Sequence, residues 1–282
     1  MKTSLTFVSP LNFLRQRYFF AALGLSPVLL FNYRKLPRDR RGFGKLLIFS
    51  FFNVTSLVAT LVGLADEGSG MASVLTYTQP LFLFALAVPF LSEKVTSSRV
   101  LGGLLGFVGI VVLSFRALGL FSLESTIVLL LGALLWAVAN VCYKKYMTQI
   151  DPMFTNFFQL VVGAILLSIV CLCMNDYAFP TSLTYLSTML YSSVGASSVG
   201  DTIWLVLLCS EDATILAGSS FLVPLIALFF GSILLGEPIN QQSVLGSVLV
   251  LLGVYFVNVH KKNSHASRRT EISYMNYDHS LQ

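Results

Sequence analysis

Asp201 and two serines that precede it form the pattern in this sequence that is best suited to chemistry. Ser193, Ser197 and Asp201 are spaced four residues apart, so they share one face if the segment is helical. A carboxylate beside hydroxyl groups could bind the ammonium group of a solute or accept a proton. If the helix instead ends near Gly200, Asp201 lies at a hydrated helix end, and the sequence leaves both interpretations open.

Neutral polar and aromatic side chains inside otherwise apolar stretches form a second group. Amides and hydroxyls at such positions either bind a solute or hydrogen-bond to a neighbouring helix, and tryptophan suits either a binding site or a lipid interface. With the first group included, the candidates for solute binding are Asn53, Tyr77, Gln79, Trp136, Asn140, Ser197, Asp201 and Ser219.

The sequence argues against catalysis and against metal binding. His260, His265 and His279 lie at or beyond the end of the last apolar stretch, so no serine has a histidine base and no helix pairs histidine ligands. An aspartyl site would need two carboxylates at membrane depth, and only Asp201 is available there. We therefore expect no enzymatic activity, no cofactor and no metal.

Charge is scarce along the whole chain. The 282 residues include 18 Lys and Arg and 13 Asp and Glu, and the mean hydropathy is +0.78. A soluble protein of this size needs more charged residues on its surface. We therefore expect that most of the surface faces a lipid bilayer. Most of the charge-free stretches approach the roughly 20 residues that cross a bilayer as a helix. They cover residues 18–33, 46–65, 68–92, 100–115, 125–143, 152–175, 177–200, 213–236 and 238–260.

These stretches predict an all-α polytopic membrane bundle of nine helices, the first extended to residues 11–31 and the fourth to 99–118. Beta-barrel strands would be half as long and would alternate in polarity. Arg15 and Arg17 fall inside the first helix, and we expect both to snorkel toward the head groups. The tail, 261–282, is polar and is expected to be disordered.

The distribution of positive charge predicts how the chain crosses the membrane. Fourteen of the 18 Lys and Arg fall on one side, within residues 34–45, 94–99, 144–145 and 261–269. Lys and Arg prefer cytoplasmic loops, so we expect the N-terminus outside and the C-terminus in the cytoplasm of a multi-pass cell-membrane protein. The net charge of +5 is then an orientation signal and gives no reason to expect nucleic-acid binding.

An internal repeat with an offset of 144 residues divides the chain in two. It pairs a proline, a glutamate and two glycines without a gap: Pro80 with Pro224, Glu93 with Glu237, Gly102 with Gly246 and Gly109 with Gly253. The charge pattern makes the two copies run in opposite directions, and inverted-topology repeats are typical of secondary transporters. Proline inside a helix can form a kink or hinge, whereas a structural role at the helix end is favoured for the two glutamates.

The residues that open and close the second copy resemble the EamA family of the drug/metabolite transporter superfamily. The resemblance covers Phe7 to about His260 and rests on Leu135, Trp136, Ala137, Asn140, Tyr143, Lys144, Lys145, Gly236, Glu237, Pro238, Gly246 and Gly253. It implies ten helices in two five-helix halves, with several of the candidate polar residues around a central cavity. Here residues 7–31 resemble the family's second helix, so we expect the first half to lack its first helix.

The resulting division is a first repeat over 1–118, a second repeat over 119–260 and the tail 261–282. The expected function is secondary transport of small metabolites such as amino acids, by export and alternating access. The alternative is a non-transporting membrane sensor or accessory subunit. The expected partners are a small-molecule solute and the lipid bilayer, with a homodimer left open.

Overall fold

The computed structural model describes residues 4–31, 40–66, 69–93, 95–115, 122–235 and 240–259, and all the regular structure within them is helical. The helices pack into two compact units, which are described separately. Unit 1 comprises Met1–Glu93 and Ser114–Leu216, and unit 2 comprises Lys94–Leu113 and Ala217–Gln282. Each unit draws helices from both copies of the sequence repeat. The predicted tail, 261–282, lies outside the described residues.

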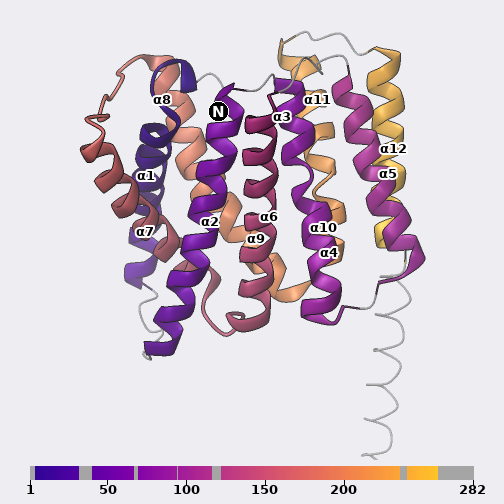
Figure 1. The fold of residues 1–282 in the computed structure, drawn as a ribbon, viewed down its shortest axis with the longest axis horizontal. Coiled ribbons are helices and arrows are strands. Elements are labelled where there is room, and N and C mark those ends of the chain that lie inside the picture. Colours follow the sequence, from indigo (N-terminus) through magenta and orange to yellow (C-terminus); the bar gives the residue numbers. More distant parts are fainter. Residues whose placement is uncertain are drawn as a thin grey trace, which may run out of the picture. The chain divides into compact units, whose positions relative to one another are not determined.

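Unit 1 contains most of the long helices, and in it α2 packs along α6 and α1 packs along α7 (Figure 1). Its members are a short 3-10 turn Ser4–Thr6, α1 Pro10–Phe31, α2 Arg40–Asp66, α3 Ser69–Thr76, α4 Gln79–Leu91, α6 Leu123–Tyr146, α7 Pro152–Cys173, α8 Leu183–Leu190, the π-helix Tyr191–Gly200, α9 Asp201–Ser210 and the start of α10 Ala213–Ser219.

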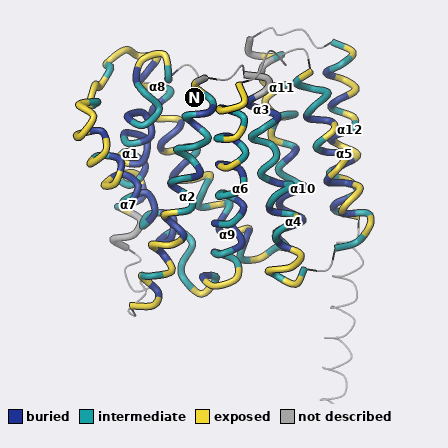
Figure 2. The backbone as a smooth tube through the Cα atoms, in the orientation of Figure 1, coloured by how far each residue is buried: buried dark blue, intermediate teal, exposed yellow. Residues whose placement is uncertain are grey.

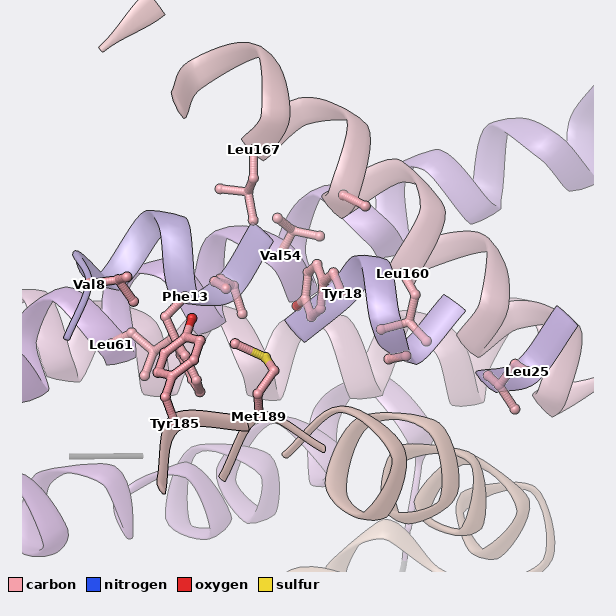
Figure 3. Close-up of a cluster of buried hydrophobic side chains, with 13 residues drawn as sticks. Val8, Phe13, Tyr18, Leu25, Val54, Leu61, Leu160, Leu167, Tyr185 and Met189 are labelled. Atoms are coloured by element: carbon pink, nitrogen blue, oxygen red, sulfur yellow. The ribbon is translucent and has the colours of Figure 1, made fainter. Parts of the chain in front are cut away.

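Apolar side chains from three other helices hold α1 inside unit 1. Phe13 and Tyr18 of α1 meet Leu160 of α7, Val54 of α2 and Tyr185 of α8 in one buried cluster (Figure 3). Gly163 of α7 allows this packing, because a Cβ there would lie 2.3 Å from the Tyr18 ring. The cluster fixes the height and rotation of α1, and therefore the position of its polar residues.

Eight helical segments among the described residues are long and apolar enough to cross a membrane. The helix α1 has 22 residues but is less apolar, because its first half carries Asn12, Arg15, Gln16 and Arg17. Exposed positions recur along the lengths of the helices and not only at their ends (Figure 2). Many of these exposed side chains are large and apolar, as lipid contact requires. The predicted multi-pass helical architecture is therefore confirmed.

Unit 2 is built on a glycine seam between α5, Ser97–Ser114, and α12, Gln241–Asn258, and it also contains α11, Leu222–Leu235. A Cβ on Gly102 would lie 2.6 Å from the carbonyl oxygen of Gly253, and one on Gly109 would lie 2.9 Å from that of Gly246. The backbones thus approach more closely than any other residue would allow. The contacts run in opposite order along the two helices, so α5 and α12 are antiparallel.

Hydrogen bonds at the two ends of this seam are related by the 144-residue repeat. Ser98 Oγ donates to the Phe256 carbonyl oxygen at 2.7 Å, and Gln242 Nε2 donates to the Val112 carbonyl oxygen at 2.9 Å. Ser98 corresponds to Gln242, and Val112 corresponds to Phe256. Such an exchange of equivalent contacts is the signature of a two-fold axis, here relating two similar helices of one chain.

Helix ends recur at the same spacing. The starts of α3 and α10 and of α5 and α12, and the ends of α2 and α9, α4 and α11, and α5 and α12, each differ by 144 residues. The 22-residue helices α1 and α7 match at the offset of 142 that relates Pro10 to Pro152. The repeat seen in a few residues therefore extends to the boundaries of the helices.

The prolines of the repeat lie at helix starts and do not kink a continuous helix. Pro80 is the second residue of α4, which begins after a turn at Tyr77 and Thr78, and Pro224 is the third residue of α11, which begins after a turn that follows Ser219. Proline is tolerated in a first turn, where its missing N–H would have no helical partner. The expectation of a kink inside a helix is corrected to an interruption between two half-helices, at equivalent places in both repeats.

The glycine seam yields a prediction for stability. Gly102→Ala should lower the melting temperature in detergent by about 5 °C, because the new methyl group must push two backbones apart at a cost of about 1–3 kcal/mol. Gly103→Ala is the matched control, since a Cβ at Gly103 meets nothing within 4 Å. Thermal unfolding followed by size-exclusion chromatography measures both variants. Equal melting temperatures for the two would contradict the close approach of α5 and α12.

Candidate functional site

Asp201 lies inside a continuous helical segment. The helices α8 and α9 and the π-helix between them run without a break from Leu183 to Ser210, and Asp201 is the first residue of α9. It is nine residues from the end at Ser210, a rise of about 14 Å at 1.5 Å per residue. The interpretation in which the helix ends near Gly200 is therefore wrong, and Asp201 is an acidic residue within a membrane span.

Arg17 also lies inside the protein and does not snorkel. Only 4% of its surface is exposed, and its Nε donates a hydrogen bond to Ser197 Oγ at 2.7 Å. Arg15 is half-buried and donates to Asn12 Oδ1 of its own helix. The expectation of two snorkelling arginines is thus corrected for Arg17. The spacing of the two arginines could have indicated that only one of them reaches the head groups, because residues two apart on a helix point in different directions.

The bond to Ser197 brings Arg17 beside Asp201, which follows Ser197 by one helical turn. This places the Arg17 guanidinium close enough to the Asp201 carboxylate for the two opposite charges to attract each other, and Tyr18 is the next residue of α1. Asp201 keeps accessible surface, whereas Arg17 and Tyr18 are buried. A charge at membrane depth is costly when it is isolated, so the opposite charges stabilise each other.

A buried amide holds the π-helix against α7 and α1. Asn156 Nδ2 lies 2.8 Å from the Ser197 carbonyl oxygen, 3.2 Å from that of Ser198 and 2.8 Å from Thr202 Oγ1. Ser198 Oγ donates to the Ala21 carbonyl oxygen at 2.9 Å. These side-chain bonds to backbone carbonyl groups hold the wider turns of the π-helix against its two neighbours, where lipid could offer no such bonds.

An aromatic pair connects α6 to α9 near this segment. The ring centroids of Trp136 and Trp204 are 5.2 Å apart, with the rings tilted by 41°. Trp204 Nε1 donates to Asn140 Oδ1 at 2.5 Å, and Asn140 Nδ2 donates to the Trp136 carbonyl oxygen at 2.7 Å. Asn140 is therefore buried with its amide satisfied, and it fixes the orientation of one indole.

Other predicted residues lack such partners. In the described part of the chain, the side chains of Asn53, Tyr77, Gln79 and Asp201 have no hydrogen-bond partner, and all four are partly exposed. Tyr77 and Gln79 flank the interruption between α3 and α4. An unpaired polar group facing lipid costs several kcal/mol, so these side chains fit a lining that water or a solute can reach.

The predicted solute-binding residues therefore fall into three groups. Asn53, Tyr77, Gln79 and Asp201 make no side-chain hydrogen bond among the described residues of unit 1, whereas Asn140, Ser197 and the stacked Trp136 are held in contacts within that unit. Ser219 belongs to unit 2, where its Oγ is 3.4 Å from Asn258 Nδ2.

Glu93 connects the end of α4 to the start of α10. Its carboxylate accepts hydrogen bonds from Ala213 N at 2.7 Å, Thr214 N at 3.0 Å and Thr214 Oγ1 at 2.8 Å. Lys144 Nζ lies 3.8 Å from Glu93 Oε1 and also donates to the carbonyl oxygens of Leu208 and Glu211. This clasp ties together four helices, α4, α6, α9 and α10. Its repeat equivalent, Glu237, lies outside the described residues.

The described residues contain no group of three or more His, Cys, Asp or Glu side chains that could hold a metal ion. Cys142, Cys171, Cys173 and Cys209 are free thiols. Among the predicted solute-binding residues, the polar groups are therefore the Asp201 carboxylate and the surrounding amides, hydroxyls and indole.

Comparison with known proteins gives concordant matches over most of the chain. The sequence pattern of the EamA-like transporter family matches residues 1–115 and 124–259. The "Uncharacterized transporter YvbV" of Bacillus subtilis (strain 168) is 27% identical over 269 residues, covering 94% of this chain and 88% of the relative. A solved structure titled "Crystal structure of protein" superposes with a TM-score of 0.78 at 14% identity, covering 93% of this chain and 91% of that one, and so shares the fold.

Two further relatives have names that state a solute. The "Probable amino-acid metabolite efflux pump" of Salmonella typhimurium (strain LT2) is 28% identical over 204 residues, covering 68% of this chain and 67% of the relative. The "S-adenosylmethionine uptake transporter" of Rickettsia prowazekii (strain Madrid E) is 24% identical over 254 residues, covering 89% and 84%.

The Glu93 clasp predicts a large effect of a single substitution. Glu93→Ala removes three hydrogen bonds and an ion pair from the start of α10, so the melting temperature in detergent should fall by about 5 °C, as expected for a loss of about 2 kcal/mol. Glu124→Ala, at the exposed start of α6, is the control and should change the melting temperature little. A Glu93→Ala protein as stable as wild type would show that the clasp contributes nothing.

Proposed function

The chain belongs to the EamA-like transporter family, and on this premise we propose that it is a secondary carrier that exports small metabolites such as amino acids by alternating access. The observation that carries this proposal is the pair of interrupted helices, α3–α4 and α10–α11, at equivalent places in the repeat. Broken helices in inverted repeats are where secondary transporters build their solute sites, because unwound backbone and free side chains can then meet the solute.

The polar groups at these places fit a small amphiphilic solute. Tyr77 lies in the first interruption and Gln79 directly follows it, both without a hydrogen-bond partner among the described residues. Asn53 and Asp201 supply an amide and a carboxylate from α2 and α9. The proposed roles are hydrogen bonding by the neutral groups and binding of an ammonium group, or of a proton, by Asp201. The tryptophan pair offers an apolar surface to the rest of the solute.

We assign the two repeats to residues 1–118 and 119–260, which the recurring helix ends support. The proposed orientation, with the N-terminus outside and the C-terminus in the cytoplasm of the cell membrane, rests on the distribution of Lys and Arg. No Walker-type nucleotide loop occurs in the sequence, so coupling would come from an ion gradient or from exchange. The relative named as an efflux pump for amino-acid metabolites supports the solute class.

Transport in proteoliposomes tests the proposal. Vesicles loaded with a mixture of radiolabelled proteinogenic amino acids should release label faster with the protein than without it. If no label and no other small metabolite moves, the alternative of a membrane sensor or accessory subunit is favoured.

Asp201→Asn should slow this release by about ten-fold or more, because a charge-assisted contact worth about 1.5–3 kcal/mol is lost. Membrane insertion and the size-exclusion profile should not change. The matched control is Asp176→Asn, since Asp176 lies outside the spans and accepts from Ser9 and Asn12. An asparagine there can still accept from Asn12 through its oxygen and donate to the Ser9 hydroxyl through its NH2 group. Release by Asp201→Asn at the wild-type rate would remove Asp201 from the site.

A further inference from the structure

Exposed cations gather in unit 1 where α2 begins and α6 ends. Arg41 and Lys45 lie one turn apart near the start of α2, and Lys145 lies in the last turn of α6; these three residues form the basic patch. Lys45 Nζ donates to the Tyr146 carbonyl oxygen at 3.2 Å, so the two helix ends lie side by side. Both are also ends of membrane spans, which places the basic patch at the level of the lipid head groups.

Apolar side chains next to the basic patch are also exposed. Lys145 Nζ lies 5.5 Å from the centroid of the Tyr146 ring and 5.9 Å from that of the Phe90 ring at the end of α4. Tyr146 is 54% exposed and Phe90 is 50% exposed. Ile48, which follows Lys45 by three residues and therefore lies one turn deeper in the span, is 55% exposed. Positive groups and apolar surface thus lie together, which is what an amphiphilic anion requires.

The acidic side chains at this end of unit 1 do not neutralise the basic patch. None of its three cations forms an ion pair within the described part of the chain. Glu93 is instead the partner of Lys144, and the Asp151 carboxylate accepts hydrogen bonds from Met153 N and Phe154 N at the start of α7. The positive charge is therefore available to a ligand.

The start of α2 adds to this positive potential. The N-terminal end of a helix carries a partial positive charge from its backbone N–H groups, so acidic residues are favoured there and basic residues are not. The first turn of α2 contains Arg40 and Arg41 and no acidic residue. A bound anion would offset the repulsion between these cations and the helix end.

We propose that the basic patch binds the phosphate of an anionic phospholipid, with the acyl chains against the exposed apolar side chains beside it. Ammonium and guanidinium groups at a membrane surface attract anionic head groups, and the guanidinium fork suits a phosphate. Inorganic phosphate would satisfy the charges but would leave the apolar surface uncovered, so a lipid fits both features. The proposal does not depend on the transport of any solute.

Thermal unfolding of the full chain in a neutral detergent tests the proposal with three probes. Dioleoyl phosphatidylglycerol is anionic, dioleoyl phosphatidylcholine has the same chains on a zwitterionic head group, and glycerol 3-phosphate is an anion without chains. Saturating phosphatidylglycerol should raise the melting temperature by about 5 °C, because it binds the folded state. About 0.5 M NaCl should reduce this shift, since the charges are exposed. The other two probes should shift the melting temperature by less than about 1 °C.

Substitutions in the basic patch should remove the effect of phosphatidylglycerol. The triple variant Arg41→Gln, Lys45→Gln, Lys145→Gln should lose most of the shift. Lys145→Gln alone should reduce the shift clearly and should fold normally, because the Lys145 ammonium makes no hydrogen bond within the described chain. This single variant keeps the test valid if the triple variant does not fold. A wild-type shift in Lys145→Gln overturns the role of Lys145.

A second triple variant controls for the change in net charge. Lys261→Gln, Lys262→Gln, Arg268→Gln removes the same number of positive charges from the tail and should keep the wild-type shift. An equal loss in the tail variant would reveal a general attraction to charge and overturn the basic patch as a site. An equal shift with phosphatidylcholine would show that the phospholipid need not be anionic. An equal shift with glycerol 3-phosphate would make the ligand a soluble anion, and either result overturns the proposal.

Discussion

The bilayer interior offers no hydrogen bonds, and this constraint shapes every polar position in the protein. A side chain at membrane depth either finds a partner inside the protein or faces a space that water enters. Ser56 illustrates the first outcome, since its Oγ donates to the Gly132 carbonyl oxygen at 2.8 Å and holds α2 against α6. Gln79 illustrates the second, because it is partly exposed at a helix interruption and has no described partner. The distinction separates residues that hold the fold from residues available to a solute.

The same constraint explains why the helices pack through small residues. Lipid chains are as apolar as leucine, so association depends on close contact and on hydrogen bonds between helices. In unit 2, glycines bring α5 and α12 into backbone contact, and Ser98 and Gln242 add one hydrogen bond at each end. In unit 1, the large rings of α1 instead pack into the gap left at Gly163. The two units are therefore held together differently, unit 2 by backbone contact at glycines and unit 1 by ring packing at a glycine.

The helices could be predicted from the sequence because long stretches without charged residues identify the segments that can lie in lipid. The expected first helix, 11–31, differs from α1 by one residue, and the repeat offset reappears in the helix ends. The interruption after Thr76 was harder to predict, since Pro80 indicates a break without showing on which side it falls. Arg17 is bonded to Ser197, a partner 180 residues away, and local sequence contains no information about that contact. Likewise, the packing units cut across the repeats because α5 pairs with α12.

The exchange of equivalent contacts between α5 and α12 has a consequence for the origin of the chain. The Ser98–Phe256 and Val112–Gln242 bonds are two copies of one interaction, made once in each direction. A contact of this kind does not require two different sequences. An ancestral protein of half this length, inserted into the membrane in both orientations, could have formed the same antiparallel seam between two identical copies. Fusion of the two copies would then have fixed their opposite orientations in one chain. Each half would then have been free to diverge, and the difference between Arg17 and its counterpart Gln159 is one example.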